Sequence, residues 1–581
     1  MKLEQVISTF EEIEQTNSRN EMAELLGKLF KTIDNADDLD KVVKLCQGQI
    51  VSNLSQQDKL GVAEASVINA LTLVSGYDKE RIKNLTAKKG DVGSAAEELL
   101  AKKKQVSLFS EAKKLEVKNL FTIIGTLAEI EGNDKIRYLQ KIITELTPTQ
   151  AKYIIRAIIG VLRLGFSTQT IIDGLAIGLT GDKTNRLAIE KAYNFNPDLS
   201  VVACQILKDG VVSIETPMIQ YDTPIKPMLA SRLKVEEILP KMGGRCFAEW
   251  KLDGVRVQIH LNSRKIKNTG NPKLDYEYNI KLYSRNLADV TDQFPEIKKY
   301  VIDNVDAYNC VLDGEIVPRP KDGKMIPFQV VMQRKRKHNI AEAVKEIPIV
   351  VFVFDIIKLG DKDYTSTPYR LRKEILKNLI LDNDDIMFVN AQQVNNLSQL
   401  VQYFEEAQKL GMEGIICKSV DGLYEAGKRG NTWVKLKSLE GARLGDTIDV
   451  VVIGGYHGRG RRAESGGAFL CAILDKENDR LIAFTKLGTG FTDEVLNELT
   501  AKVRDHVVPM PHPRVFSYVQ PDVWFEPFLV IEIMADEIQF REGKVYSPRF
   551  PVFKAVREDK TVDDITTLKE ITAMYKRQHN V

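Results

Sequence analysis

The pattern of apolar and polar residues divides the chain into an N-terminal helical part and two later parts built from strands. Apolar residues recur at helical spacing in segments such as 22–33 (MAELLGKLFKTI), 151–164 (AKYIIRAIIGVLRL) and 170–179 (TIIDGLAIGL), with short polar breaks between them. Up to about residue 215, no convincing alternation of apolar and polar residues predicts a strand. We therefore expect residues 1–222 to form an all-α domain.

The pattern changes after a proline-punctuated segment at 224–230 (PIKPMLA). The runs that follow are short, rich in β-branched residues and typical of strands: VRVQIHL, IKLYSRN, NCVLDGEIV, IPIVVFVFDII, EGIICKS and TWVKLK. Helical segments such as 369–380 (YRLRKEILKNLI) and 397–411 (LSQLVQYFEEAQKLG) lie between them. Residues 223–442 are therefore predicted to form an α+β domain built on antiparallel sheets.

A second change comes near residue 443, where short apolar runs alternate with glycine-rich turns. The segment 488–507 (GTGFTDEVLNELTAKVRDHV) predicts a helix inserted between strands. We expect residues 443–581 to form a small all-β barrel.

Composition mainly excludes classes of protein. The 581 residues include 82 basic and 80 acidic side chains, so the net charge of +2 does not indicate a nucleic-acid-binding protein, and any basic surface must be local. The six cysteines are scattered without a C-x-x-C pair, which argues against a zinc ribbon or a disulfide framework and suits a reducing compartment. No targeting peptide and no membrane-spanning apolar run is evident. We expect a soluble, cytoplasmic protein.

The first candidate for chemistry is the stretch 247–260, FAEWKLDGVRVQIH, which predicts two strands joined by a tight turn at Asp253-Gly254. Glu249 and Lys251 are two positions apart, so they point to the same face of the first strand. A lysine before an Asp-Gly turn is more often a solvated strand end than a catalytic group. This stretch alone does not decide between the two.

Charged residues also recur near the ends of later strands that otherwise look buried. One such residue is commonly part of a surface ion pair worth about 0–1 kcal/mol. Buried charges without partners cost several kcal/mol, so a whole set of them indicates convergence on one charged ligand. The set consists of Arg256, Arg285, Glu315, Glu413, Lys418, Lys435 and Lys437.

These residues lie in motifs that resemble those of the covalent nucleotidyltransferases, in the same order. EWKLDGVR is similar to the K-x-D-G-x-R signature, LYSRN, LDGEIV, FVFDIIKL, EGIICKS and WVKLK resemble the later motifs, and RFPVFKAVREDK resembles the last. Together they are similar to ATP-dependent DNA ligases of the archaeal and eukaryotic replicative type. RLGFSTQTIIDGLA and AYNFNPDLSVVA resemble the helical DNA-binding domain of those ligases, so the resemblance covers nearly the whole chain.

The resemblance implies a monomeric enzyme that seals nicks between 3′-hydroxyl and 5′-phosphate ends of duplex DNA in replication, repair and recombination, with ATP and Mg²⁺ as cofactors. Lys251 would be the nucleophile that takes up AMP through a phosphoramidate bond. A free lysine has a pKa of about 10.4, and desolvation and nearby cations would lower that pKa. The cations implied are the metal ion, Arg256, Lys435 and Lys437.

The other roles implied by the resemblance concern the nucleotide. Glu249 would read the adenine edge and Phe354 would stack on the base, although an aromatic residue in an apolar strand is equally typical of a core. Glu315 would hold the ribose or a metal ion, and Glu413 would help to bind Mg²⁺. The side chains expected to contact the nucleotide or the 5′-phosphate are Arg285 and Arg429.

On the same resemblance, the C-terminal part would be an OB-fold whose basic turn at 455–463 (GYHGRGRRA) faces the DNA backbone. Arg557 and Lys560 of the last motif would orient pyrophosphate. Val552 departs from many relatives, which have arginine at that position, so no role is assigned to it. The stretch 262–280 is longer than the hairpin expected there, and no function is assigned to it either.

The segment 102–114 (KKKQVSLFSEAKK) resembles the short peptide by which replication enzymes dock on a sliding clamp of the PCNA type. The residues that carry this resemblance are Gln105, Leu108 and Phe109. The alternative is that Leu108 and Phe109 begin the next amphipathic helix, and the sequence leaves both interpretations open.

Four other functions agree less well with the sequence. RNA ligases and mRNA-capping guanylyltransferases have a similar core but commonly lack a large helical N-terminal domain. A DNA-binding scaffold without catalysis is disfavoured by the intact set Lys251, Glu315, Glu413 and Lys435. A bacterial NAD-dependent ligase would usually carry a four-cysteine zinc module, which the scattered cysteines cannot build. The sequence leaves open whether ADP or GTP replaces ATP and which divalent metal ion works best.

Overall fold

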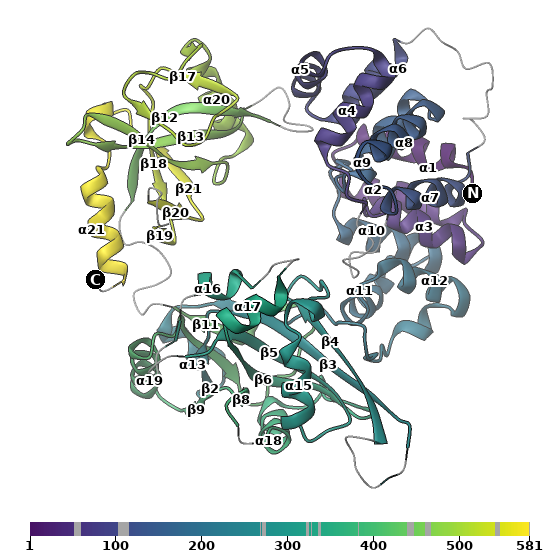
Figure 1. The fold of residues 1–581 in the computed structure, drawn as a ribbon, viewed down its shortest axis with the longest axis vertical. Coiled ribbons are helices and arrows are strands. Elements are labelled where there is room, and N and C mark those ends of the chain that lie inside the picture. Colours follow the sequence, from purple (N-terminus) through teal and green to yellow (C-terminus); the bar gives the residue numbers. More distant parts are fainter. Residues whose placement is uncertain are drawn as a thin grey trace. The chain divides into compact units, whose positions relative to one another are not determined.

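A computed structural model describes residues 1–50, 60–102, 115–267, 269, 275–320, 325–326, 328–334, 339–381, 383–437, 447–458, 466–540 and 546–579 (Figure 1). These residues fall into two units by their contacts. One unit takes its residues from 1–61, 113–131 and 160–441, and the other from 62–112, 132–159 and 442–581. In the part of the chain that the structure describes, no helix is long and apolar enough to cross a membrane.

The expected helical N-terminal part is confirmed, because the described residues before Leu229 contain helices and no strand. The helices are α1 (Leu3–Glu14), α2 (Arg19–Lys31), α3 (Ala36–Cys46), α4 (Glu64–Ser75), α5 (Lys79–Lys89), α6 (Val92–Ala101), α7 (Val117–Gly125), α8 (Gly132–Glu145), α9 (Pro148–Ile158), α10 (Thr168–Leu175), α11 (Arg186–Phe195) and α12 (Leu199–Asp209). Thr147 and Gln150 form a capping box at the start of α9, with Pro148 in its first turn. That helix ends at Ile158, six residues before the predicted end.

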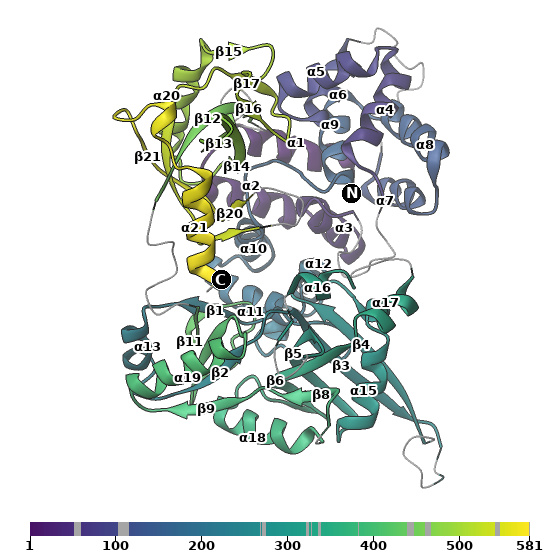
Figure 2. The ribbon, with the colours of Figure 1, turned by 60° about the vertical axis from the view of Figure 1, so that its left-hand side comes forward.

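The α+β part contains two sheets, and Figures 1 and 2 show their strands between residues 229 and 436. The five-stranded sheet has the order β1-β11-β10-β2-β9, formed by β1 (Leu229–Arg232), β2 (Cys246–Lys251), β9 (Ala391–Val394), β10 (Gly414–Ser419) and β11 (Arg429–Leu436). The six-stranded sheet has the order β4-β3-β5-β6-β7, with β8 beside β6. Its strands are β3 (Val255–Lys265), β4 (Tyr276–Ser284), β5 (Asn309–Pro318), β6 (Ile349–Leu359), β7 (Lys362–Asp363) and β8 (Ile386–Phe388).

Helices lie between these strands in the sequence, as predicted. They are α13 (Val235–Lys241), α15 (Glu296–Asn304), α16 (Phe328–Met332), α17 (Ile340–Glu346), α18 (Tyr369–Leu379) and α19 (Leu397–Lys409). The two longest follow the segments expected from sequence, because each repeats apolar residues at helical spacing. Most strand pairs are antiparallel, which agrees with the predicted class; the exceptions here are β1 with β11 and β6 with β8.

The hairpin predicted at 247–260 is wrong. Strand β2 pairs with β9 and β10, whereas β3 pairs with β4 and β5, so the Asp253-Gly254 turn carries the chain from one sheet to the other. Gly254 does not have the positive φ expected of a two-residue hairpin turn. Its role is close approach, because a Cβ there would lie 2.3 Å from the carbonyl oxygen of Ile316.

The five-stranded sheet has one apolar and one charged face. Residues paired across strands point to the same side, and Ala248, Cys417 and Val434 are such a row in the hydrophobic core. The next row, shifted by one residue, places Glu249 beside Ile416 and Lys435. A third row on that same face joins Phe247, Lys418 and Trp433. The alternation therefore gathers Glu249, Lys418 and Lys435 on one face of this sheet.

The C-terminal part is rich in strands and contains the predicted inserted helix, α20 (Asp493–Arg504). The main sheet runs β15-β17-β12-β13-β14-β16, and β18 pairs with both β12 and β21. Its strands are β12 (Ile448–His457), β13 (Gly466–Asp475), β14 (Arg480–Leu487), β15 (Val507–Val508), β16 (Val515–Phe516), β17 (Val523–Phe525), β18 (Val530–Met534) and β21 (Val552–Val556). A separate pair, β19 (Glu537–Gln539) and β20 (Ser547–Arg549), and helix α21 (Leu568–His579) complete it. The described pairings do not close this sheet into a barrel.

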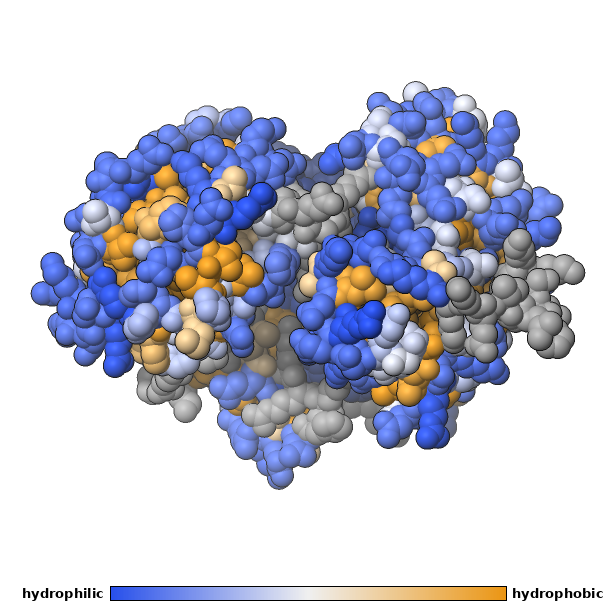
Figure 3. Space-filling view, turned by 90° about the horizontal axis from the view of Figure 1, so that it is seen from above, coloured by the Kyte–Doolittle hydropathy of each residue, from blue (hydrophilic) through white to orange (hydrophobic). Residues whose placement is uncertain are grey.

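Hydrophilic residues cover most of the molecular face drawn in Figure 3, and hydrophobic residues are visible between them. This is typical of folded proteins, whose surfaces keep much apolar area. Large apolar side chains are buried among the N-terminal helices and in the cores on the inner faces of the sheets.

Candidate active site

Three charged side chains meet at the end of strand β2. The backbone N–H of Glu413, just before β10, donates to the carbonyl oxygen of Lys251 (3.0 Å) and fixes the two residues side by side. Glu413 Oε2 contacts Lys251 Nζ, and Glu413 Oε1 contacts Lys437 Nζ just beyond β11. The three side chains are 17–25% exposed, so a ligand can reach them. The structure thus brings together three residues that are far apart in the sequence and were all predicted.

Gly414 explains how Glu413 reaches this position. Its φ is +144°, and a Cβ at this residue would lie 2.2 Å from the carbonyl oxygen of Leu436. Only glycine fits so close to the neighbouring strand in that conformation. The glycine therefore lets β10 and β11 approach where their charged side chains converge.

Arg256 lies on the six-stranded sheet and is tied to Asp313. Its Nε donates to Asp313 Oδ1 (3.0 Å) and its Nη2 to Oδ2 (2.6 Å), while Nη1 donates to the carbonyl oxygen of Met228 (2.7 Å). The hydroxyl of Tyr424 donates to the same carboxylate (2.8 Å). The charge of Arg256 is thus largely balanced by a buried aspartate that sequence reasoning did not single out.

Glu315 lies opposite Arg256 on the neighbouring strand β5. Burial raises the pKa of Glu315 to about 8, and the nearby Arg256 guanidinium only partly offsets this rise. At neutral pH the side chain is therefore mostly protonated in this state. A protonated carboxyl can both donate and accept hydrogen bonds, which suits contact with a sugar hydroxyl.

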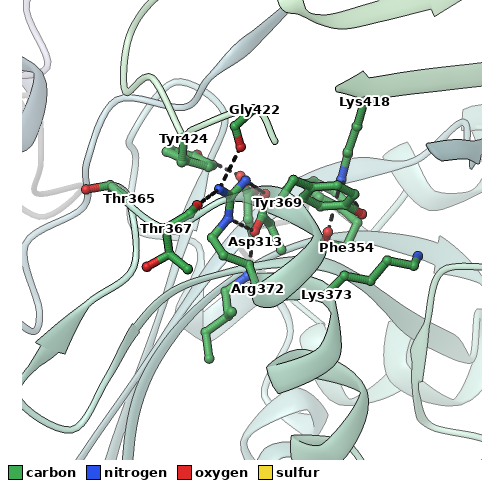
Figure 4. Close-up of polar contacts among 12 residues, drawn as sticks. Asp313, Phe354, Thr365, Thr367, Tyr369, Arg372, Lys373, Lys418, Gly422 and Tyr424 are labelled. Carbon is green, nitrogen blue, oxygen red and sulfur yellow. Dashed lines mark hydrogen bonds and ion pairs between the residues drawn. The ribbon is translucent and has the colours of Figure 1, made fainter. Parts of the chain in front are cut away.

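Aromatic rings join the polar faces of the two sheets. Phe354 of β6 and Trp433 of β11 meet edge to face with centroids 6.0 Å apart. Lys418 Nζ lies 4.7 Å from the first ring centroid and 4.4 Å from the second, and it donates to the Phe354 carbonyl (3.0 Å). The guanidinium carbon of Arg256 lies 5.5 Å from the Phe354 centroid and 5.6 Å from the Trp433 centroid. Figure 4 shows Phe354, Lys418 and Tyr424 in this region.

Glu249 is almost fully buried, with 2% of its surface exposed. Tyr369 donates its hydroxyl to Glu249 Oε1, and Lys418 Nζ lies 2.7 Å from Oε2. Lys373 Nζ is 3.6 Å from Oε1. The carboxylate is therefore held by groups from α18 and β10.

The remaining predicted residues are placed as follows. Lys435 is on the same face as Glu249, whereas Arg285 and Arg429 are exposed at the ends of β4 and β11. Arg557 and Lys560, beyond β21, both contact Asp449 of β12: Nη1 of Arg557 lies 3.2 Å from Oδ1, and Nζ of Lys560 lies 2.6 Å from Oδ2. The clamp residues Gln105, Leu108 and Phe109, and the arginines of the basic turn, lie outside the described residues.

Sequence reasoning missed several side chains at this site. They are Asp313, Tyr369, Lys373, Tyr424 and Trp433. One signal was available on α18, whose buried stripe of tyrosine and leucine also includes a charged residue, Arg372. A charge on the buried side of an amphipathic helix indicates a partner beneath it.

A preformed metal cage is absent from the part of the chain that the structure describes, which contains no cluster of three or more histidine, cysteine, aspartate or glutamate side chains able to hold an ion. Glu413 and Glu315 nevertheless supply oxygen donors beside Lys251 and Arg256. Mg²⁺ commonly binds one or two carboxylates together with substrate phosphates. Glu413 fits a site of that kind.

Comparison with protein-family models gives three consecutive matches. Residues 2–176 match the model described as DNA ligase N terminus, 227–437 the ATP dependent DNA ligase domain, and 462–560 the ATP dependent DNA ligase C terminal region. Together these matches cover most of the chain.

Similar whole proteins are found among curated sequences and solved structures. The chain is 36% identical to "DNA ligase 2" of Thermofilum pendens over 98% of this chain and 96% of that protein. It is 34% identical to the DNA ligase of Saccharolobus shibatae over 100% of this chain and 98% of that protein. The solved structure titled "Pmar-Lig_PreS3" shares the fold, with a TM-score of 0.56 at 18% identity over 95% of this chain and 99% of the other.

Proposed function

Because this chain belongs to the ATP-dependent DNA ligase family, we propose that Lys251 is the nucleophile that attacks the α-phosphate of ATP. Enzymes of this family join the 3′-hydroxyl and 5′-phosphate ends of nicked duplex DNA. The observation that carries the assignment is the contact of Lys251 and Lys437 with the two oxygens of Glu413.

The proposed first step forms a bond between Lys251 Nζ and the α-phosphorus and breaks the bond from that phosphorus to the bridging oxygen, so that pyrophosphate leaves. The amine must first lose its proton, and Glu413, in direct contact with Nζ, can accept it. AMP then passes from Lys251 to the 5′-phosphate of the nick. Finally the 3′-hydroxyl attacks that phosphate and releases AMP. Positioning and electrostatics supply most of the acceleration in such transfers.

We assign the nucleotide contacts to the polar faces of the two sheets. Glu249 is proposed to read the base edge, Phe354 to stack on the base and Glu315 to hold the ribose. Burial of Glu249 and the closeness of Phe354 to Trp433 support a closed, aromatic base site. The cations proposed to contact phosphate groups are Arg256, Arg285, Arg429, Lys435 and Lys437.

Glu413 is proposed to hold Mg²⁺ together with the phosphates, and Glu315 to join it once the cation has displaced the proton that its raised pKa retains. When bound, the ion would neutralise charge on the phosphate oxygens and stabilise the leaving group. Before that, Glu413 must give up part of its contact with the two lysines.

The C-terminal part is proposed to be an OB-fold that brings Arg557 and Lys560 to the pyrophosphate of ATP. The antiparallel pairing of β12 with β13, of β13 with β14 and of β18 with β21 supports this assignment. The domain boundaries proposed are 1–222, 223–442 and 443–581. They agree with the helices that precede Leu229 and with the separate sheet that starts at Ile448.

We also propose that the enzyme acts as a monomer in the cytoplasm and docks on a sliding clamp through Gln105, Leu108 and Phe109. The clamp assignment rests on the sequence alone. Changing Leu108 and Phe109 together to alanine is expected to abolish clamp binding in a pull-down while leaving nick sealing intact. Persistent clamp binding by that variant would contradict the assignment.

The role of Lys251 is tested by nick sealing with Lys251→Ala. We expect no sealing with ATP, but residual sealing of a nick that already carries AMP on its 5′-phosphate, because that reaction needs no lysine nucleophile. Lys362→Ala, an exposed lysine on β7, is the matched control and should seal both substrates normally. Normal ATP-dependent sealing by Lys251→Ala would contradict the proposal.

A further inference from the structure

Glu249 has an unusually complete set of partners for a residue proposed to read a base. The Tyr369 hydroxyl and Lys373 Nζ approach one carboxylate oxygen, and Lys418 Nζ approaches the other. An ionised carboxylate offers about four lone-pair directions. Tyr369 and Lys418 occupy two of these directions, and Lys373 Nζ stands 3.6 Å from the oxygen that Tyr369 bonds. What remains for a ligand can only accept a hydrogen bond.

Two of the three groups come from α18, which lies outside the family motifs of the sequence analysis. The start of this helix is fixed by Arg372, which forms a buried two-point ion pair with Asp355 (2.7 and 3.0 Å) and donates to the carbonyl oxygens of Thr367 (2.5 Å) and Gly422 (3.1 Å). Figure 4 shows Arg372 with Thr367 and Gly422, and the neighbouring Tyr369. The backbone N–H of Tyr369 also donates to Gly422 (3.0 Å). Tyr369 therefore approaches Glu249 from a backbone that is fixed to strand β6 and to the loop after β10.

Aromatic rings surround Lys373. Its Nζ lies 4.4 Å from the ring centroid of Phe388 and 5.2 Å from that of Phe247, and it makes no hydrogen bond among the described residues. Burial lowers the pKa of Lys373, and the nearby Glu249 carboxylate acts in the opposite direction. The Lys373 side chain is 14% exposed, and its Nζ faces the Glu249 carboxylate at 3.6 Å. Lys373 thus adds to the positive surroundings of that carboxylate.

The consequence is a buried carboxylate whose oxygens are held in place as hydrogen-bond acceptors by the groups around them. A charged carboxylate accepts hydrogen bonds from the 6-amino group of adenine, whereas the 6-oxo group of guanine would face it as a second acceptor. The arrangement would therefore discriminate between the two purines.

We propose that Tyr369 and Lys373 are positioning residues that hold Glu249 as a fixed acceptor and thereby set the preference for a 6-aminopurine nucleotide. The inference rests on the proposed contact between Glu249 and the base edge. It adds the two residues that orient this contact. It also implies that GTP is a poorer substrate than ATP, a point that the sequence left open.

The test compares self-adenylation by ATP with the corresponding reaction of purine riboside 5′-triphosphate, which lacks only the 6-amino group. The wild type should prefer ATP by about tenfold or more in kcat/KM, as expected for a hydrogen bond to a charged group. Tyr369→Phe keeps the ring and its contact with Phe247 but removes the hydroxyl. It should reduce the preference to less than about threefold, mainly through a higher KM for ATP.

Tyr403→Phe is the matched control, because the Tyr403 hydroxyl is also largely buried but bonds Asn390. It should keep the wild-type preference. Lys373→Met should also reduce the preference for ATP, but by less than Tyr369→Phe does. The reason is that Lys373 Nζ lies 3.6 Å from the Glu249 carboxylate. If Tyr369→Phe lowers kcat/KM equally for both triphosphates, or changes neither value, the Tyr369 hydroxyl has a structural role or none. Either result overturns the inference.

Glu249→Gln separates this inference from the proposed function beneath it. If that variant keeps the full preference for ATP, the proposed contact between Glu249 and the base is wrong. If Glu249→Gln loses the preference while Tyr369→Phe keeps it, the base contact stands and the positioning role fails. GTP serves as a second probe, and its use should rise in Tyr369→Phe relative to the wild type.

Discussion

Glu413 and Asp449, two carboxylates in different parts of the chain, each contact a pair of cationic side chains. The two pairs differ in whether they lie at the ends of paired strands or in a segment after a strand. Lys251 and Lys437 lie at the ends of β2 and β11, the two strands that flank β10. Arg557 and Lys560 lie beyond the end of β21 instead, in the segment that follows that strand.

The partners differ as well. Arg557 divides its guanidinium between Asp449 and Asp559, with Nη2 2.7 Å from Asp559 Oδ2. Glu413 has both oxygens engaged by the two lysines. We infer that the cluster around Glu413 places the nucleophile Lys251 at the strand ends, whereas the cluster around Asp449 holds two cations that exchange partners when a polyphosphate arrives. Neutralising each carboxylate should therefore have unequal consequences.

The largest effect is expected for Glu413→Gln. Removing the charge leaves Lys251 and Lys437 without their shared counterion and removes the proposed proton acceptor. Self-adenylation with labelled ATP should slow by about a hundredfold or more, the range found when a single electrostatic group is lost from an active site. Glu425→Gln is the control and should have little effect on the rate. Glu425 lies in the loop between β10 and β11, and its carboxylate accepts a hydrogen bond from the Thr432 hydroxyl. A self-adenylation rate for Glu413→Gln within threefold of the wild-type rate would contradict the larger role assigned to Glu413.

Asp449→Asn should have a smaller effect, and only on the first step. Arg557 and Lys560 would repel each other without the carboxylate, so self-adenylation and its reversal by pyrophosphate should weaken by about tenfold. Sealing of a nick that already carries AMP involves no pyrophosphate and should change by less than about twofold. Asp563→Asn, which alters an exposed partner of Arg514, is the control. Equal losses in both reactions would indicate a structural role for Asp449.

The smallest effect concerns Glu315 and the pH dependence of stability. Its pKa is raised from 4.5 to about 8, so the folded protein keeps this proton over a range in which the unfolded chain loses it. The stability from this group is full below about pH 4.5 and is lost as pH rises through about 8. Glu315→Gln cannot titrate at this position. The Tm of the wild type should therefore fall by a few degrees relative to the Tm of the variant between pH 5 and 8.5. A constant difference would show that the pKa is not raised.

Much of the fold follows from local patterns in the sequence. Apolar spacing identified α2, α18, α19 and α20, and short apolar runs rich in β-branched residues identified β3, β5, β6, β10 and β11. The Asp253-Gly254 turn shows the limit of this reasoning. The dipeptide indicates that the chain turns, but the hydrogen-bonding partners of β2 and β3 lie far away in sequence, and they place the two strands in different sheets.

The site was predictable where chemistry is concentrated in motifs and unpredictable where it depends on packing. Glu249 and Lys251 share a face because strands alternate, and that much follows from their spacing. The hydroxyl of Tyr369 reaches Glu249 only because Arg372 fixes α18 against Asp355 and Gly422. No local pattern specifies such a contact across about 120 positions of the chain.

The most direct test of the account is peptide mapping by mass spectrometry after the full-length protein has been incubated with ATP and magnesium. The account predicts one AMP adduct, on Lys251, which disappears when pyrophosphate is added in excess. An adduct on another lysine, such as Lys437 or Lys418, or the absence of any adduct, would contradict it.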